Sequence, residues 1–96
     1  MSEFKKIAEV SQEFIDGVQN LLFLNVQACV DLPEKVSILQ QPVFDDTINF
    51  LITVSSKDVA KVVGQQGKIA NALRIIAKAA AKGQFITMLV VEEAKL

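Results

Sequence analysis

Two glycines three positions apart, Gly64 and Gly67, constrain the fold of this chain more than any other feature of its sequence. An apolar pair precedes them, and Lys68 opens the basic, alanine-rich stretch that follows. Because glycine has no Cβ, two glycines at this spacing let the backbone turn tightly and bring its N–H groups against another backbone. The pattern therefore predicts a tight turn between two helical segments, of a kind that suits a phosphate group.

The charge of the chain is unevenly distributed. Its 96 residues, 51% of them hydrophobic, suffice for one compact domain, and the net charge is −1. From Lys57 to Lys82, six basic residues stand against one acidic residue, a balance of +5, whereas the remainder carries −6. A positive segment of this kind forms a local binding face for an anion, and the acidic remainder predicts modest, salt-sensitive affinity.

Several classes of chemistry are excluded by residues that the chain lacks. Cys29 is the only cysteine and histidine is absent, so we expect no disulfide, no metal site and no cofactor. The adjacent Asp45 and Asp46 fall in a predicted turn and need not converge, so we expect no catalytic residue. A Walker A loop needs four residues between its glycines, and here two intervene. Neither a signal peptide nor a membrane span of ~20 residues is expected, and a reducing, cytoplasmic location is favoured.

The N-terminal part has the apolar periodicity of an amphipathic helix from Glu3 to about Val30. Gly17 lies within this pattern, and glycine costs ~1 kcal/mol relative to alanine inside a helix. We therefore predict a break or bend near this residue. On that basis the chain divides into an N-terminal helical extension, residues 1–17, and a domain spanning residues 18–96.

Three strands are predicted after Pro33. The first is a short strand, Lys35–Gln40, and Pro42–Asp46 is the predicted connection. Thr47–Val54 is rich in β-branched and aromatic residues and is apolar on both faces, which predicts a central strand covered by helices or by a neighbouring subunit. Phe85–Val91 is the predicted final strand, followed by a polar tail.

Two helices are predicted between the last two strands. Ser55 and Asp58 have the spacing of a capping box, which predicts a short helix ending at Val62 or Val63. The second helix, Gly67–Lys82, has one apolar stripe and one basic arc, and Gly83 is the predicted C-cap. The stripe comprises Ile69, Leu73, Ile76 and Ala80, and the arc comprises Lys68, Arg74, Lys78 and Lys82.

The order of these elements resembles the KH domain. Strand, short helix, glycine turn, longer helix and strand make the minimal KH core, and segment 62–69 resembles the KH signature, in which an aliphatic pair precedes GxxG. A helix and a strand before this core resemble the type II KH domain. The implied fold is α+β, in the order α-β-β-α-α-β, with a three-stranded mixed sheet, helices on one face and here an extra N-terminal helix. From about Val18 to Val91 the chain resembles the small bacterial single-KH proteins of the KhpA type.

This resemblance implies a non-catalytic protein that binds single-stranded RNA, as a dimer or with a larger KH-containing partner. The family's GxxG turn contacts the RNA backbone, aliphatic positions form one wall of the base groove, and basic positions flank the turn. The residues that match are Gly64, Gln65, Gln66 and Gly67 in the turn, Val62, Val63 and Ile69 in the wall, and Lys61, Lys68 and Arg74 beside it. The two glutamines replace a residue that is commonly basic, so we expect weaker and less salt-dependent binding than in such relatives.

Two functions are compatible with these residues. The first is an RNA clamp with weak sequence preference, because no aromatic stacking platform is evident. The alternative is a KH-fold interaction module with weak or no RNA binding of its own. Ile75 projects beside the basic arc and forms, with Ala72 and Ala79, a candidate helix–helix contact in a dimer.

Overall fold

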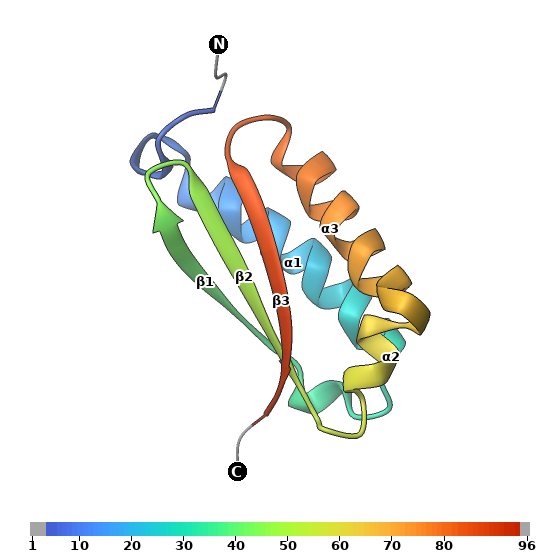
Figure 1. Ribbon diagram of the computed structural model, residues 1–96. Coiled ribbons are helices and arrows are strands. Elements are labelled where there is room, and N and C mark those ends of the chain that lie inside the picture. Colours follow the sequence, from blue (N-terminus) through green and yellow to red (C-terminus); the bar gives the residue numbers. More distant parts are fainter. Residues whose placement is uncertain (1–3, 95–96) are drawn as a thin grey trace.

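The computed structural model describes residues 4–94, which form a sheet layer and a helix layer (Figure 1). The elements are a 3₁₀ turn at Ile7–Glu9, α1 Gln12–Cys29, a 3₁₀ turn at Pro33–Lys35, β1 Ser37–Phe44, β2 Thr47–Val54, α2 Val59–Val63, a 3₁₀ turn at Gln65–Gly67, α3 Lys68–Ala81 and β3 Ile86–Glu93. Helices α1 and α3 cover one face of the sheet (Figure 1).

The sheet is mixed, with β2 at its centre as predicted. Strand β1 pairs antiparallel with β2, and Ile38 lies opposite Ile52. Strand β3 pairs parallel with β2, and Leu89 lies opposite Phe50. A parallel neighbour requires a crossover connection, and α2, the glycine turn and α3 provide it. The predicted α+β fold with a three-stranded mixed sheet and helices on one face is therefore confirmed.

The core lies between the inner face of the sheet and the two long helices. Every second residue of β2 points inward, as the period of a strand requires, and is at most 1% exposed. The main core residues are Ile48, Phe50, Ile52 and Val54 of β2, Ile15, Val18, Leu22 and Val26 of α1, and Leu73 and Ala77 of α3. Burial of this apolar surface is the main stabilising contribution to the domain.

Helix α1 contradicts the predicted break at Gly17, because it is continuous from Gln12 to Cys29. Gly17 is exposed and no atom lies within 4 Å of the position of a Cβ, so only the helix propensity of glycine opposes the helix there. Packing of the opposite face of α1 outweighs that cost. The helix begins instead after Ser11, whose Oγ accepts a hydrogen bond from the Phe14 N–H at 3.3 Å. The expected extra N-terminal helix is reduced to the 3₁₀ turn Ile7–Glu9, and Glu3 lies outside the described residues.

Two strands are longer than predicted. Strand β1 continues through Pro42 to Phe44 with a bulge between these residues, so the connection to β2 is only Asp45 and Asp46. A proline is tolerated there because β1 is an edge strand. Strand β3 extends to Glu93 rather than ending at Val91, and the last two residues of the predicted polar tail lie outside the described part of the chain.

Helix α3 confirms the predicted helix and shifts its details by about one residue. Gly67 is the N-cap, and Lys82, with φ +52°, is the C-cap in place of Gly83. The fully buried line runs through Ala70, Leu73, Ala77 and Ala81, while Ile69, Ile76 and Ala80 are half-buried beside it. Of the four residues in the predicted stripe, only Leu73 lies at the centre of the surface that faces the core. The other three lie at the edge of that surface.

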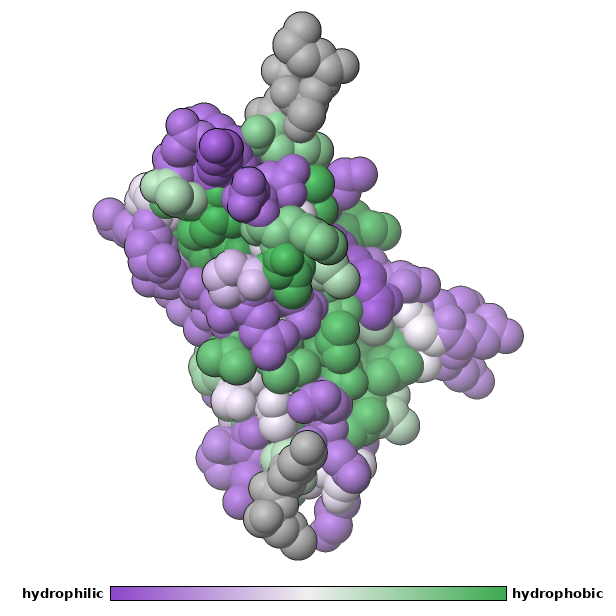
Figure 2. Space-filling model, turned by 60° about the vertical axis from the view of Figure 1, so that its left-hand side comes forward, coloured by the Kyte–Doolittle hydropathy of each residue, from purple (hydrophilic) through white to green (hydrophobic). Residues whose placement is uncertain are grey.

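The outer face of the sheet is not covered by any element within residues 4–94. Leu39, Leu51 and Val90 lie side by side across the three strands on this face, and Leu39 is 57% exposed. Figure 2 shows areas of hydrophobic surface, in green, between hydrophilic side chains, in purple.

Within residues 4–94, none of the helices has the length and apolar character that a membrane span requires.

Candidate nucleic-acid interface

The turn between α2 and α3 requires both glycines. Gly64 has φ +77° and ψ +170°, a region that is essentially restricted to glycine, and Gly67 is left-handed with φ +75°. A Cβ on Gly64 would also lie 2.7 Å from Cγ1 of Ile69, closer than real contacts allow. The Gly67 N–H donates to the Gly64 carbonyl at 3.1 Å, which closes the turn.

The two glutamines form the exposed tip of this turn. The Lys68 N–H donates to the Gln65 carbonyl, whereas the N–H groups of Gln65 and Gln66 take no part in the two bonds that close the turn. Immediately afterwards α3 begins, a helix of 14 residues whose N-terminal end carries a partial positive charge. The tip therefore presents backbone donors and a favourable helix dipole to an anion.

The aliphatic residues around the turn differ in accessibility. Val63 and Ile69 are half-buried and border the turn, in agreement with a role in a groove wall. Val62 is completely buried in the core, so its predicted place in the accessible wall is corrected. Its side chain belongs to the core cluster and holds α2 against the rest of the domain.

Lys61 is engaged by two carboxylates, which the sequence did not reveal. Its Nζ forms ion pairs with Asp31 and, at 3.4 Å, with Asp58. The hydrogen bond to Asp31 is the main reason that the pKa of Lys61 is raised above its ordinary value. Its charge is therefore compensated within the fold, and the prediction of Lys61 as a basic residue available beside the turn is corrected.

Asp58 anchors the start of α2 to the segment that follows α1. It is completely buried, and its Oδ1 and Oδ2 accept hydrogen bonds from the N–H groups of Asp31 (3.1 Å) and Leu32 (3.0 Å). Burial raises the pKa of Asp58, but these donors and Lys61 outweigh it, so the pKa lies below its ordinary value. The predicted capping box is wrong, because this carboxylate does not reach back to Ser55. No local sequence signal identifies this role, since the partners lie 26 and 27 residues away.

Arg74 connects the basic side of α3 to the free edge of β3. Its guanidinium donates to Oδ1 of Asn71 at 2.8 Å and to the backbone carbonyl of Leu89 at 3.2 Å. Lys68, Lys78 and Lys82 are exposed on the same helix or at its end. Basic side chains therefore follow α3 from the glycine turn to its C-terminal end.

The candidate dimer contact is exposed on α3. The side chain of Ile75 is 69% exposed, and Ala72 and Ala79 are exposed one turn to either side. An isolated exposed isoleucine is unremarkable in itself, but the small neighbours leave room for another helix to approach closely.

No group of three or more histidine, cysteine, aspartate or glutamate side chains within residues 4–94 is arranged to hold a metal ion.

The central strand, short helix, GxxG turn, long helix and parallel final strand, preceded by α1 and β1, define a KH domain of type II. The chain belongs to the KhpA/KhpB KH-domain family, whose model matches residues 19–91. Proteins of this family are not enzymes, so the chain is assigned no catalytic activity.

Curated relatives agree with this assignment. The RNA-binding protein KhpA of Clostridium perfringens is 36% identical over 64 residues, covering 67% of this chain and 84% of the relative. The RNA-binding protein KhpA of Listeria monocytogenes is 34% identical over 59 residues, covering 62% and 76%, respectively. That of Treponema pallidum is 36% identical over 64 residues, covering 66% and 78%. The comparison with solved structures gives no significant match.

Proposed function

We propose that this protein binds single-stranded RNA without catalysis and holds the phosphate backbone with the turn Gly64–Gly67. The observation that carries the proposal is the exposed tip of this turn, where the backbone donors of Gln65 and Gln66 precede the N-terminus of α3. Such a loop clamps about four nucleotides in KH domains. The names of the curated relatives, RNA-binding protein KhpA, support the same ligand.

The neighbouring residues have distinct proposed roles. Lys68 and Arg74 supply positive charge, and Val63 and Ile69 supply the apolar border against which bases lie. Val62 supports this border without touching RNA, and Lys61 contributes little net charge because Asp31 and Asp58 pair with it. Because the tip carries glutamines rather than a basic residue, the clamp is weak and depends on the adjacent basic surface of α3.

A second function, pairing with another KH domain, is favoured by the exposure of Ile75. In this proposal Ala72, Ile75 and Ala79 form a contact with a second copy or with a larger KH-containing protein, in the cytoplasm. Pairing would place two glycine turns in one assembly and raise the effective affinity for a longer RNA. As an alternative main function, the chain acts as an interaction module whose own RNA binding is weak or absent.

Binding of a fluorescently labelled eight-nucleotide single-stranded RNA, measured by anisotropy, tests the clamp. Gln65→Asp with Gln66→Asp places two negative charges at the exposed tip, and aspartate tolerates the left-handed conformation of Gln66. Gly64→Asp is less suitable, because a Cβ there overlaps Ile69 and disturbs the turn itself.

The matched control is Asn20→Asp with Leu24→Asp, which adds the same charge to an exposed face of α1. We expect the tip variant to lose at least tenfold in affinity while the control retains most of it. Equal binding by both variants would refute the clamp. Binding that appears only after a KH-containing partner is added would favour the interaction module.

A further inference from the structure

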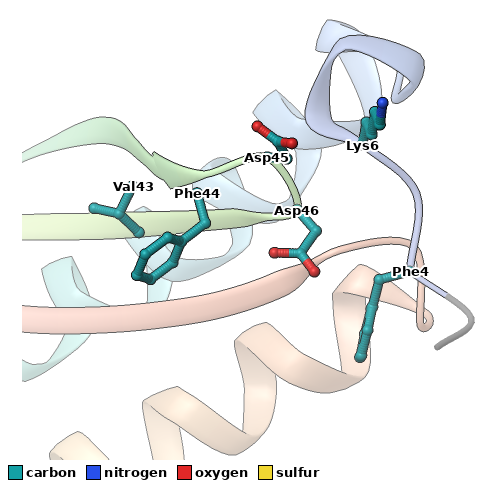
Figure 3. Close-up of a pocket in the computed structure, with 6 residues that line it drawn as sticks. All are labelled: Phe4, Lys6, Val43, Phe44, Asp45 and Asp46. Carbon is teal, nitrogen blue, oxygen red and sulfur yellow. The ribbon is translucent and has the colours of Figure 1, made fainter.

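A pocket of about 480 Å³ lies where α3 ends and β3 begins, at the opposite end of α3 from the glycine turn. Its lining residues are Phe4, Lys78, Gly83, Phe85, Ile86 and Thr87. Phe4 belongs to the N-terminal segment that precedes the residues matched by the family model. Figure 3 draws a neighbouring pocket that shares Phe4, and there the ring of Phe4 lies beside the C-terminal end of α3. The pocket therefore combines the KH domain with a segment outside the family match.

Backbone hydrogen bonds hold this N-terminal segment in place. The Lys5 N–H donates to the Gln84 carbonyl at 3.0 Å, in the loop between α3 and β3. The Ile7 N–H donates to the Asp45 carbonyl at 2.5 Å, in the turn between β1 and β2. These bonds fix the two residues Lys5 and Ile7 that follow Phe4, and Phe4 itself is 40% exposed.

The pocket continues the surface that begins at the glycine turn. Arg74 joins α3 to the edge of β3 at Leu89, and Lys78 lies about one helical turn farther along α3. Thr87 precedes Leu89 by two residues on β3, so it points to the same face of the sheet. From Gly67 to Lys78 the helix rises about 16 Å, at 1.5 Å per residue. An RNA strand that left the turn along α3 would therefore reach this pocket after about that distance.

The chemistry of the pocket suits a nucleobase. Phe85 is 2% exposed, and its ring makes an edge-to-face contact with Phe14 at a centroid distance of 6.3 Å, so it forms a rigid apolar floor. Phe4 supplies an aromatic side wall, and Lys78 adds a positive charge to the lining. The volume falls within the ~300–1,000 Å³ typical of small-ligand pockets. Aromatic side chains bind single-stranded bases by stacking, largely independently of sequence.

We propose that this base pocket, formed by Phe4, Lys78, Phe85 and Thr87, receives a nucleobase of the same RNA strand that the glycine turn holds. The N-terminal segment thus extends the RNA site beyond the KH clamp and adds an aromatic side wall to the floor that Phe85 provides. This inference rests on the proposed RNA-binding function, and its test is designed to separate the two.

The test compares RNAs of four and eight nucleotides, because only the longer one spans the turn and the pocket. Phe4→Ala in the full chain should weaken binding of the eight-nucleotide RNA by about 5- to 100-fold and leave the four-nucleotide RNA unaffected. Phe4→Trp should retain binding, since it keeps a stacking ring. Phe44→Ala is the matched control, because Phe44 is 70% exposed but does not line this pocket.

An abasic nucleotide moved along the longer RNA then locates the contact. At one position, removal of the base should weaken binding to the wild type and have no further effect on Phe4→Ala. Unchanged binding by Phe4→Ala, with binding abolished by Gln65→Asp and Gln66→Asp, would overturn the base pocket and leave the clamp intact. Equal losses on both RNA lengths would also overturn it, because they would indicate a general structural effect. Absence of RNA binding by the wild type would overturn the proposed function and the base pocket together.

Discussion

A Cβ atom on Gly64 would lie 2.7 Å from Cγ1 of Ile69, so the first glycine of the turn is packed directly against the first turn of α3. Gly64→Ala introduces this overlap and also forces alanine into a backbone region that is essentially restricted to glycine. We expect the substitution to lower the free energy of unfolding by about 3 kcal/mol, measured by chemical denaturation.

Gly67→Ala is the matched comparison. Gly67 is left-handed, but the nearest atom to its Cβ position, Nδ2 of Asn71, is 4.0 Å away, so only the backbone conformation opposes alanine. The expected loss is about 1 kcal/mol. An equal or larger loss at Gly67 would contradict the packing role assigned to Gly64.

Replacing Gln65 by lysine tests the view that the turn lacks a cation. We expect Gln65→Lys to tighten binding of single-stranded RNA and to steepen its salt dependence by about 0.7 in log–log slope, the value for one additional phosphate contact with a single strand. The measurement is anisotropy over a series of salt concentrations. Lys61→Ala should change this slope by less, because Asp31 and Asp58 already compensate its charge. A larger change at Lys61 would show that these ion pairs open when RNA binds.

The buried carboxylate of Asp58 predicts a loss of stability in acid. Because its pKa in the folded state lies below the ordinary value of 3.8, the folded protein binds this proton less tightly than the unfolded chain does. Its stabilising contribution is complete well above that value, and it is lost as the pH falls first through the unfolded-state pKa and then through the folded-state pKa. We therefore expect the free energy of unfolding to fall below about pH 5 and to continue falling toward pH 3.

Asp58→Asn separates this carboxylate from the other acids. Its amide presents one acceptor where Asp31 and Leu32 each donate a backbone N–H, so one donor loses its partner and the variant is less stable at neutral pH. Its stability should also depend less on pH in the acid range than that of the wild type. Glu34→Gln, at an exposed position, serves as the control. An unchanged acid dependence in Asp58→Asn would assign the effect to other groups.

The exposed Ile75 predicts an oligomeric state that one charge disrupts. If α3 pairs about a twofold axis, Ile75→Asp brings two like charges together in the contact. Size-exclusion chromatography with light scattering should then give twice 10.5 kDa for the wild type and 10.5 kDa for the variant. Leu24→Asp, at a similarly exposed leucine of α1, should leave the mass unchanged. An identical mass for wild type and Ile75→Asp would refute the proposed dimer contact at Ile75.

The parts of the fold that sequence predicted well depend on local patterns. The alternation of inward residues in β2 and the apolar periodicity of α3 are set by the geometry of a strand and a helix, and both elements were predicted within about one residue. The glycine turn was predicted for a similar reason, because Gly64 adopts a conformation that few other residues tolerate.

The errors arise where a distant partner decides the outcome. Gly17 lies in a continuous helix because the far side of α1 packs on the core, and Pro42 stays in β1 because the edge position needs no donor. Lys61 is separated from Asp31 by 30 residues, so its spacing relative to the turn says nothing about their ion pair. The position of Phe4 beside the end of α3 is likewise set by distant partners, because the residues that follow it form backbone hydrogen bonds to Gln84 and Asp45.

The exposed tip of the turn receives the RNA backbone in the function that we propose, and residue-resolved amide chemical shifts during RNA titration test this contact most directly. With a single-stranded eight-nucleotide RNA added to the isotopically labelled protein, we expect the largest shift changes at the N–H groups of Gln65, Gln66 and Lys68. The N–H groups of Leu39 and Leu51, whose side chains lie on the outer face of the sheet, should not move. Large changes on that face, with the turn unaffected, would contradict the account.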